Sequence, residues 1–359
     1  MYGRKYGFEE PFGDVCDFVI NVNNENSEIS ILQLTDIQVI DASQCRGENR
    51  LRDDEKKAWA KEKIANNCYN HIRSLVTQTN PDLIFITGDI VYGEFDDSGK
   101  VLSEFIAFMD SFKLPWAPVF GNHDNESLIG IDKQCEMYEH GEYCIFKRGT
   151  VTGNSNYTIG LVAKEKLKTI MYMIDTHGCV KEKGIYLDQL LEMQNKAKRV
   201  ATKCGEVPQG FMAMHIPVDI FRKAEYEKGY TTDETSLYIL GVDKKPVDGD
   251  FGFSLEEETI HGYIPTNEEF NKTLKVCNIN GIFAGHFHNK STCINYKGIK
   301  LVYGLKTGQY DYHVPGQVGG TLITLDKTSN YFKVQHIPSL IPLCPVPSKS
   351  PSYKDFFAE

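Results

Sequence analysis

The sequence contains no apolar run of the roughly 20 residues that a membrane-spanning helix needs, so we expect no membrane span. The N-terminus, Met1 to Lys5, has basic residues but no apolar segment behind them and shows no signal peptide, although a processed secreted protein would look the same. The formal charge of −10 lacks the basic excess of a general nucleic-acid binder. These absences predict a cytoplasmic protein without a nucleic-acid partner.

Cysteine pairs and two common catalytic signatures are also missing. The ten cysteines are scattered without a CxxC pair, and in a chain of this length they are more often buried thiols than a disulfide framework. Cys135 and Cys144 flank a short loop and are the pair that we consider for a bridge. The absence of a Gly-x-Ser-x-Gly elbow and of a GxxxxGK[ST] loop argues against acyl transfer through such an elbow and against a P-loop NTPase.

The composition is that of a folded globular protein, with 359 residues of which 41% are apolar and 25% are charged. Residues 1–27 are predicted to form a polar N-terminal arm with one edge strand, and residues 28–340 one α/β domain. Within that domain, residues 226–263 are irregular and polar, which suits an insertion or lid. Residues 341–359 form a tail that is rich in proline and serine.

Strand and helix signals alternate in the first part of the domain. In residues 29–34 apolar and polar side chains alternate, which predicts a strand. Residues 54–79 predict a helix with Cys68, Ile72 and Leu75 on one face. The other predicted elements are helices at 100–112, 185–203 and 271–276, strands at 83–86, 116–120, 169–174, 210–214, 279–284, 319–325 and 331–336, a hairpin at 293–303, and a loop-rich region at 131–163 with a hairpin at 154–157.

Polar side chains follow several of these strands at the point where each strand ends. Asp36, Asp89 and Asn122 come just after three successive predicted strands, and ligands of open α/β sheets bind outside such carboxyl ends. His286 and His288 have the i, i+2 spacing that points two side chains to the same side of an extended chain. The full set of candidates is Asp36 with Gln38, Asp89, Asn122 with His123 and Asp124, His215, and His286 with His288. Mixed carboxylate, amide and imidazole groups suit a pair of transition metals.

The motifs that carry these residues resemble those of the calcineurin-like metallophosphoesterase superfamily. They are Asp36-x-Gln38, Gly88-Asp89, Gly121-Asn122-His123-Asp124, His215 and Gly285-His286-x-His288. The Gly-Asn-His-Asp-x-Glu form and the stretch from Val302 to His313 look most like the purple-acid-phosphatase-related branch. The resemblance implies an α/β fold, namely a four-layer α-β-β-α sandwich of two mixed β-sheets flanked by helices.

The resemblance also implies a role for each candidate. The implied ligands are Asp36, Asp89 and His288 for a first metal ion, and Asp89, Asn122, His215 and His286 for a second. Asp89 would therefore bridge two divalent or trivalent ions, which would be iron, zinc or manganese. His123 would act as general acid or electrostatic stabiliser, and Asp124 is grouped with it as a catalytic residue that supports it from behind.

Gln38 departs from the usual Asp-x-His pattern of the family, because an amide oxygen is a weaker and harder donor than imidazole. Two alternatives remain open. Gln38 itself would bind a metal, as the Asp-x-Gln form of manganese-dependent ADP-ribose/CDP-alcohol diphosphatases suggests. Otherwise Tyr92, which completes a Gly-Asp-x-x-Tyr motif as in purple acid phosphatases, would bind Fe(III) as phenolate, or it packs beside the site as an aromatic residue.

Further residues are candidates for substrate contact: Arg46, Arg52, His177, His261 and His313. The arginines can bind phosphate oxygens bidentately, with a solvated loop as the alternative. Overall, we expect hydrolysis of a small phosphorylated ester by a hydroxide that bridges two metal ions, with His123 as general acid. The alternatives are a phosphodiesterase or nucleotide-sugar/ADP-ribose-type diphosphatase, and, outside catalysis, a metal-site relic used as a protein-binding scaffold. The sequence does not indicate an oligomeric state.

Overall fold

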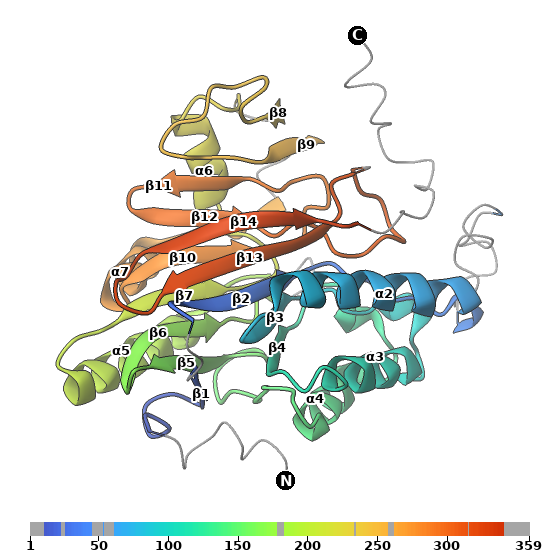
Figure 1. The fold of residues 1–359 in the computed structure, drawn as a ribbon, viewed down its shortest axis with the longest axis horizontal. Helices are drawn as coiled ribbons and strands as arrows, with labels where there is room; N and C mark the ends of the chain where they lie inside the picture. The colour runs from blue at the N-terminus through green and yellow to red at the C-terminus, as the bar shows by residue number, and fades with distance from the viewer. Residues whose placement is uncertain are drawn as a thin grey trace.

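The computed structural model describes residues 11–22, 26–44, 53, 61–177, 183–232, 235–257, 262–314 and 316–340. Within these ranges the chain forms two main β-sheets that carry helices on their outer faces (Figure 1). The observed elements and layers confirm the predicted four-layer α-β-β-α sandwich of two mixed sheets.

One sheet has five strands in the order β14-β13-β2-β3-β4. The strands are β2 (Glu28–Leu34), β3 (Leu83–Thr87), β4 (Trp116–Val119), β13 (Gly319–Asp326) and β14 (Phe332–Pro338). β2, β3 and β4 pair in parallel, whereas β13 pairs antiparallel with both β2 and β14. Because β2, β3 and β4 run in the same direction, the loops that follow them leave the same edge of the sheet.

The second sheet has seven strands in the order β1-β5-β6-β7-β10-β12-β11. The strands are β1 (Phe18–Asn21), β5 (Tyr157–Ala163), β6 (Lys166–Met173), β7 (Gln209–Ala213), β10 (Ile279–Ala284), β11 (Cys293–Tyr296) and β12 (Ile299–Tyr303). β6, β7, β10 and β12 form a parallel centre. β5 pairs antiparallel with β6 but parallel with β1, and β11 pairs antiparallel with β12. β1 lies at the edge, so the N-terminal arm contributes the edge strand that its sequence predicts.

Helices cover the outer face of each sheet (Figure 1). On the side of the five-stranded sheet they are α2 (Lys61–Thr79), α3 (Lys100–Asp110) and α4 (Gly130–His140), and on the side of the seven-stranded sheet α5 (Leu187–Cys204), α6 (Ile220–Glu227) and α7 (Glu268–Val276). α2 buries its predicted stripe, since Cys68, Ile72 and Leu75 are each at most 1% exposed. In the part of the chain that the structure describes, no helix combines the length and apolar composition of a membrane span.

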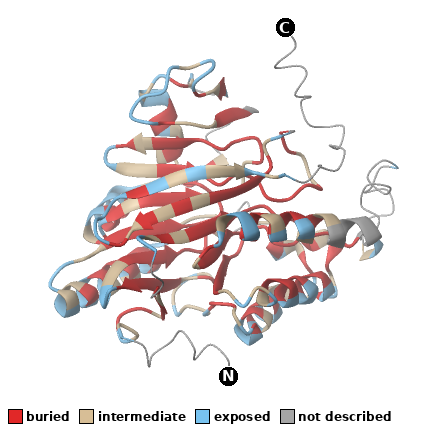
Figure 2. Ribbon diagram, in the orientation of Figure 1, coloured by how far each residue is buried: buried red, intermediate tan, exposed pale blue. Residues whose placement is uncertain are grey.

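Aromatic side chains fill the space between the two sheets. The ring centroid of Phe283 on β10 lies 5.7 Å from that of Phe85 on β3 and 5.5 Å from that of Phe211 on β7. Phe211 also packs on Phe332 of β14, with 4.7 Å between ring centroids. Figure 2 shows buried strands in the middle of the molecule and exposed residues on the outer faces of the helices. This packing sets the distance between the loops at the ends of the two sheets.

The segment that the sequence indicates as an insertion or lid, residues 226–263, contains a small two-stranded sheet. β8 (Thr235–Ile239) pairs antiparallel with β9 (Phe253–Glu257). Isolated bridges join Ser254 to Lys290 and Phe251 to Cys293, so the small sheet is attached beside β11. Among the described residues, short helical turns lie in other loops: η2 (Ala42–Gln44), η3 (Gly93–Phe95) and η4 (Asp124–Glu126).

The loop-rich prediction for residues 131–163 is wrong in its first part, because α4 begins at Gly130 and ends at His140. The helix buries Cys135 and Tyr138, but most of its residues are polar. The apolar residues are therefore too few to give a clear helical period in the sequence. Cys135 and Cys144 are both buried free thiols, and the bridge considered for this pair is not formed.

The predicted hairpin at residues 154–157 is also wrong. The turn lies instead at Lys164 and Glu165, which join β5 to β6 and have φ values of 50° and 59°. A two-residue hairpin turn requires such values, and the pairing of the two strands imposes them here. Residues 154–157 instead stabilise the loop that follows β6, because Asn156 Oδ1 accepts a hydrogen bond of 3.1 Å from the backbone N–H of Asp175.

Candidate metal centre

The carboxyl ends of strands from both sheets meet at one edge of the sandwich. The residues that follow these strands are Asp36, Asp89 and Asn122 from the five-stranded sheet, and His215, His286 and His288 from the seven-stranded sheet. The two sheets touch directly here, because His215 Nδ1 lies 2.8 Å from the carbonyl oxygen of Thr87 at the end of β3. A carbonyl only accepts, so Nδ1 of His215 carries the proton and Nε2 is the nitrogen that faces the other candidates.

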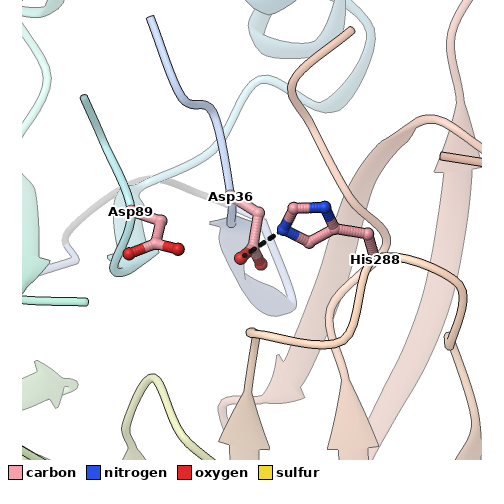
Figure 3. Close-up of side chains that lie close together, drawn as sticks. All are labelled: Asp36, Asp89 and His288. Atoms are coloured by element: carbon pink, nitrogen blue, oxygen red, sulfur yellow. Dashed lines mark ion pairs between the residues drawn. The ribbon is translucent and has the colours of Figure 1, made fainter. Parts of the chain in front are cut away.

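Asp36, Asp89 and His288 form the first group of candidate metal ligands (Figure 3). One ligand atom of each residue lies within 4.8 Å of the other two. His288 Nε2 is 3.4 Å from Asp36 Oδ1, and Figure 3 shows Asp36 between the other two side chains. All three are buried, and buried carboxylates this close together require compensating positive charge. A bound cation would supply it.

Asn122, His215, His286 and Asp89 form the second group. Asn122 Oδ1 lies 3.0 Å from His215 Nε2 and 2.9 Å from His286 Nδ1. His215 Nε2 lies 3.3 Å from Asp89 Oδ2. Ligands about 2.1 Å from one metal ion are about 3.0–3.4 Å apart at octahedral or tetrahedral angles. The spacing of these donor atoms therefore fits one bound cation.

Asp89 belongs to both groups, which is the position of a bridging carboxylate. Its Oδ2 faces His215, and its Oδ1 accepts a hydrogen bond of 2.8 Å from the backbone N–H of His123. Burial raises the pKa of Asp89, but the charges of His215 and His123 outweigh burial and lower this pKa to about 2. Asp89 is therefore an anion at neutral pH, the form in which a carboxylate binds metals.

Neighbouring charges also set the protonation of the other ligands. Burial would raise the pKa of Asp36, but the hydrogen bond with His288 and the charge of His215 hold that pKa well below its usual range. Burial and the neighbouring His215 lower the pKa of His286 to about 3, so its imidazole is neutral. For His215, Asp89 outweighs burial and raises the pKa to about 9. Binding of a metal by His215 would therefore release a proton.

Four of the candidate metal ligands have a left-handed backbone conformation, which favours glycine. The φ values are 49° at Asp36, 49° at Gln38, 51° at Asp89 and 76° at His286. This conformation costs an L-residue roughly 1–2 kcal/mol, and such strain concentrates at functional sites because the surroundings must impose it. Backbone hydrogen bonds impose it here: the N–H of Gln38 donates to the carbonyl oxygen of Asp89 at 2.9 Å.

Two glycines allow the strand-end loops to approach one another. A Cβ atom on Gly121 would overlap Oδ1 of Asp89, and one on Gly285 would overlap the hydroxyl of Thr35 and crowd Asp36. Only glycine lacks this atom. The glycines of the Gly-Asn-His and Gly-His-x-His motifs thus make room for the two carboxylates of the first group.

Asp124 lies behind the site and accepts backbone hydrogen bonds from two loops. The donors are the N–H groups of Gly121 at 2.7 Å, Asp89 at 2.9 Å, Ile90 at 3.0 Å and Val91 at 3.1 Å. Both carboxylate oxygens of Asp124 are occupied by these backbone donors, so the carboxylate is not available to a substrate. This geometry does not fit a catalytic role for Asp124. It fits the supporting one, because the carboxylate ties the loop after β4 to the loop after β3 and so positions Asp89.

His123 is held at the rim of the site by two side chains. Its Nδ1 lies 2.8 Å from Oε2 of Glu126, and its ring packs against that of Tyr92 with 4.2 Å between ring centroids and a tilt of 32°. Burial lowers the pKa of His123, but Asp89 and Glu126 outweigh burial and raise it to about 9. The imidazole is therefore protonated at neutral pH, with Nδ1 facing Glu126 and Nε2 left to donate elsewhere. Glu126 had no predicted role, and its i, i+3 spacing from His123 is the sequence signal that could have revealed it.

Gln38 is fully buried, and its Oε1 accepts a hydrogen bond of 2.6 Å from Nζ of Lys306. Lys306 is 2% exposed and also donates to the carbonyl oxygen of Asp36 at 3.0 Å. The predicted ligand atom of Gln38 is thus already in contact with an amine. Lys306 was not predicted, because a lysine in the segment after β12 belongs to no recognisable motif.

The candidates for substrate contact are spread over several loops. His313 is fully buried, its Nδ1 lies 2.8 Å from the carbonyl oxygen of Asp311, and burial lowers its pKa to about 4. His177 Nδ1 lies 3.0 Å from the carbonyl oxygen of Gly184, and its ring packs on Tyr186. Arg46, Arg52 and His261 lie outside the described residues. Substrate contact by any of these residues stays a prediction.

The fold is an α/β sandwich of two mixed sheets, with a candidate metal centre of carboxylate, amide and imidazole donors at its strand ends. The model of the family described as calcineurin-like phosphoesterase matches residues 29–290. Because this match covers well over half of the 359 residues, the chain belongs to the calcineurin-like phosphoesterase family. The predicted resemblance is confirmed.

Two relatives from Arabidopsis thaliana carry the name of the purple acid phosphatase branch. The protein named "Probable inactive purple acid phosphatase 14" is 23% identical over 287 residues, which are 70% of this chain and 64% of that protein. "Probable inactive purple acid phosphatase 29" is 24% identical over 326 residues, which are 82% of this chain and 75% of that protein. The chain thus spans 64% of the length of the first relative.

A solved structure with a similar fold is that of a dimetal phosphatase from Danio rerio. The TM-score is 0.51, and the likeness covers 88% of this chain and 98% of that chain at 11% sequence identity. At this identity the likeness concerns the fold.

Proposed function

We propose that this chain hydrolyses a phosphate ester of a small substrate with two metal ions bound in the candidate metal centre. The observation that carries the proposal is the convergence of two donor groups on one shared carboxylate, that of Asp89. Membership of the calcineurin-like phosphoesterase family supports the same chemistry. The mixed oxygen and nitrogen donors suit iron, zinc or manganese.

Six of the candidate ligands have a place in this proposal. The first ion is held by Asp36, Asp89 and His288, and the second by Asp89, Asn122, His215 and His286. When bound, the ions supply activation of water and neutralisation of phosphate oxygens. Asp124 keeps Asp89 in the shared position through the backbone of the loop after β3.

His123 is the proposed general acid. Asp89 and Glu126 keep its imidazole protonated, and the ring of Tyr92 packs against it and restricts its orientation. The Nε2–H group then donates its proton to the leaving oxygen of the ester as the bond to phosphorus breaks. A general acid of this kind typically contributes ~10²–10⁴ in rate.

Tyr92 is retained as a candidate ligand of the first metal ion. Its ring packs on that of His123 beside the site, with 4.2 Å between ring centroids. A phenolate bound to Fe(III) gives visible absorption. We therefore expect iron-loaded protein to have a visible band that Tyr92→Phe removes, and an iron-loaded protein without such a band would assign Tyr92 to packing alone.

A second candidate function is a binding scaffold built on a metal-site relic. The word "inactive" in the names of the two Arabidopsis relatives favours it. The donor set of this chain opposes it, because a relic gains nothing from strained backbone at Asp36, Asp89 and His286. Metal content and hydrolysis together distinguish the two functions.

The experiment that tests the proposed function starts with metal analysis of the purified protein. We expect two metal ions per chain and hydrolysis of p-nitrophenyl phosphate, with bis-p-nitrophenyl phosphate and ADP-ribose as probes for diesterase and diphosphatase activity. Asp89→Asn should lose both metal and activity, whereas Asp132→Asn, whose side chain is 87% exposed, should keep both. Full metal content in Asp89→Asn would refute the bridging role. Fewer than two ions in the wild type, without hydrolysis, would favour the scaffold.

A further inference from the structure

Lys306 is a buried amine beside the first group of candidate ligands. It lies in the segment after β12 and is 2% exposed. The segment folds over the loop after β2, since the N–H of Thr307 donates to the carbonyl oxygen of Thr35 at 2.9 Å and the N–H of Gly308 donates to that of Asp36 at 3.1 Å. These backbone bonds place Lys306 without help from its own side chain, so its contacts are set by the fold.

Both contacts of the Lys306 amine point to the loop that carries Asp36 and Gln38. Nζ donates to the carbonyl oxygen of Asp36 at 3.0 Å and to Oε1 of Gln38 at 2.6 Å. A lysine side chain donates through every N–H and, as an ammonium, accepts nothing. When Lys306 is charged, the Gln38 amide cannot be turned over, because its NH2 group would then face the ammonium donor to donor.

This orientation leaves the Nε2 donor group of the Gln38 amide facing away from Lys306. Among the residues that the structure describes, Nε2 of Gln38 is buried and has no hydrogen-bond partner. A buried N–H group without an acceptor is costly, so an acceptor has to be supplied. An amide nitrogen has two N–H donors and no lone pair for a metal, so Nε2 is not a ligand. Gln38 also lies beside Asp89, because its backbone N–H donates to the carbonyl oxygen of that residue at 2.9 Å.

We propose that Lys306 fixes Gln38 as a hydrogen-bond donor to a phosphate oxygen of the substrate, rather than as a metal ligand. The proposal rests on the proposed function, from which it takes the phosphate ester. Lys306 is a positioning residue, and Gln38 touches the substrate. The first metal ion is then held by Asp36, Asp89 and His288 without Gln38, which leaves coordination positions open as in other catalytic sites.

Two variants of Gln38 distinguish a donor from a ligand. Gln38→Leu removes both amide atoms, and we expect it to keep the metal content of the wild type and to bind inorganic phosphate about tenfold to a hundredfold more weakly. Gln38→Glu has the same shape and still accepts from Lys306 but has no N–H group. It should keep the metals and lose phosphate affinity at least as far as Gln38→Leu does.

The measurements are metal analysis and calorimetric titration of the metal-loaded protein with inorganic phosphate. Gln194→Leu on α5 is a matched control, because Gln194 is a buried glutamine that hydrogen-bonds to Glu269 and Thr273 on α7. It should change neither quantity. Loss of one metal ion in Gln38→Leu would make Gln38 a ligand and overturn the proposal. Unchanged phosphate affinity in either Gln38 variant would overturn it as well.

The role of Lys306 is tested by Lys306→Met alone and combined with Gln38→Leu. If the amine acts through Gln38, the double variant binds phosphate as Gln38→Leu does, whereas additive losses would assign Lys306 an effect of its own. Should Lys306→Met not fold, Gln38→Glu still tests the donor. A wild type that holds two metals but neither binds phosphate nor hydrolyses an ester would end the proposed function. Metal content of Gln38→Leu would even then decide whether Gln38 is a ligand.

Discussion

Replacement of Asp124 by asparagine tests whether this residue positions the metal-binding loops. In the wild type each carboxylate oxygen accepts two backbone hydrogen bonds. Oδ2 accepts from Asp89 and Gly121, and Oδ1 accepts from Ile90 and Val91. Asparagine keeps one of these oxygens and places an NH2 group where the other was. Two backbone N–H groups then lose their acceptor, whichever way the amide is turned.

The expected loss of stability follows from those two groups. Each buried N–H left without an acceptor costs about 1–3 kcal/mol, so Asp124→Asn should destabilise the fold by about 2–6 kcal/mol. Most folded domains are stable by only about 5–15 kcal/mol. The variant should therefore unfold at a clearly lower urea concentration, and the displaced loop after β3 should bind metal more weakly through Asp89.

Urea unfolding of the metal-free protein, followed by far-UV circular dichroism, measures the first effect without a contribution from bound ions. Asp132→Asn is the control, since that carboxylate is 87% exposed and pairs with Arg148 at the surface. Its free energy of unfolding should change by less than about 1 kcal/mol. If Asp124→Asn were as stable as this control, the four hydrogen bonds would not hold the loops and the positioning role of Asp124 would be wrong.

Three further outcomes are expected. His123→Asn should lower kcat by about 10²–10⁴ while metal content stays at the wild-type value, and an empty centre in this variant would contradict its role as general acid. Glu126→Gln should also lower kcat, but by a smaller factor than His123→Asn, because the hydrogen bond to His123 remains and only the negative charge is lost. An unchanged kcat would show that Glu126 has no role in catalysis. Burial raises the pKa of Asp17, but Lys196 and Lys147 outweigh burial and lower it from 3.8 to about 2. The ionised carboxylate therefore stabilises the fold by about 2 kcal/mol above pH 4, and this contribution should disappear as the pH falls through about 2. Urea unfolding of the wild type and of Asp17→Asn between pH 2 and 6 would measure this loss.

The gathering of candidate metal ligands at one edge of the sheets could be predicted from the sequence because it needs only local information. Asp36, Asp89 and Asn122 each follow an apolar run, and strands of this kind run parallel when helices connect them. Parallel strands present their carboxyl ends at one edge, so residues far apart in the chain are brought together by a rule that ignores their distance in sequence. The apolar stripe of α2 was predictable for a similar reason, since its period of 3.6 residues is written in the sequence.

Features that depend on contacts between distant segments could not be predicted. Lys306 is 268 residues from Gln38, and nothing near either residue indicates that the segment after β12 folds over the loop after β2. The turn at Lys164 and Glu165 contains neither glycine nor asparagine, and the strands on both sides impose its positive φ values. Contacts between distant segments, rather than the local preferences of the residues, determine both conformations.

By itself the sequence determined the class of fold, the edge of the sheets where the site forms and the chemical identity of the donor groups. Only the tertiary structure decided that Asp124 faces the backbone of the loop after β3 and that Gln38 faces Lys306. The reason is physical. Local sequence sets strand direction and side-chain chemistry, whereas distances between atoms on different loops depend on how the aromatic core spaces the two sheets.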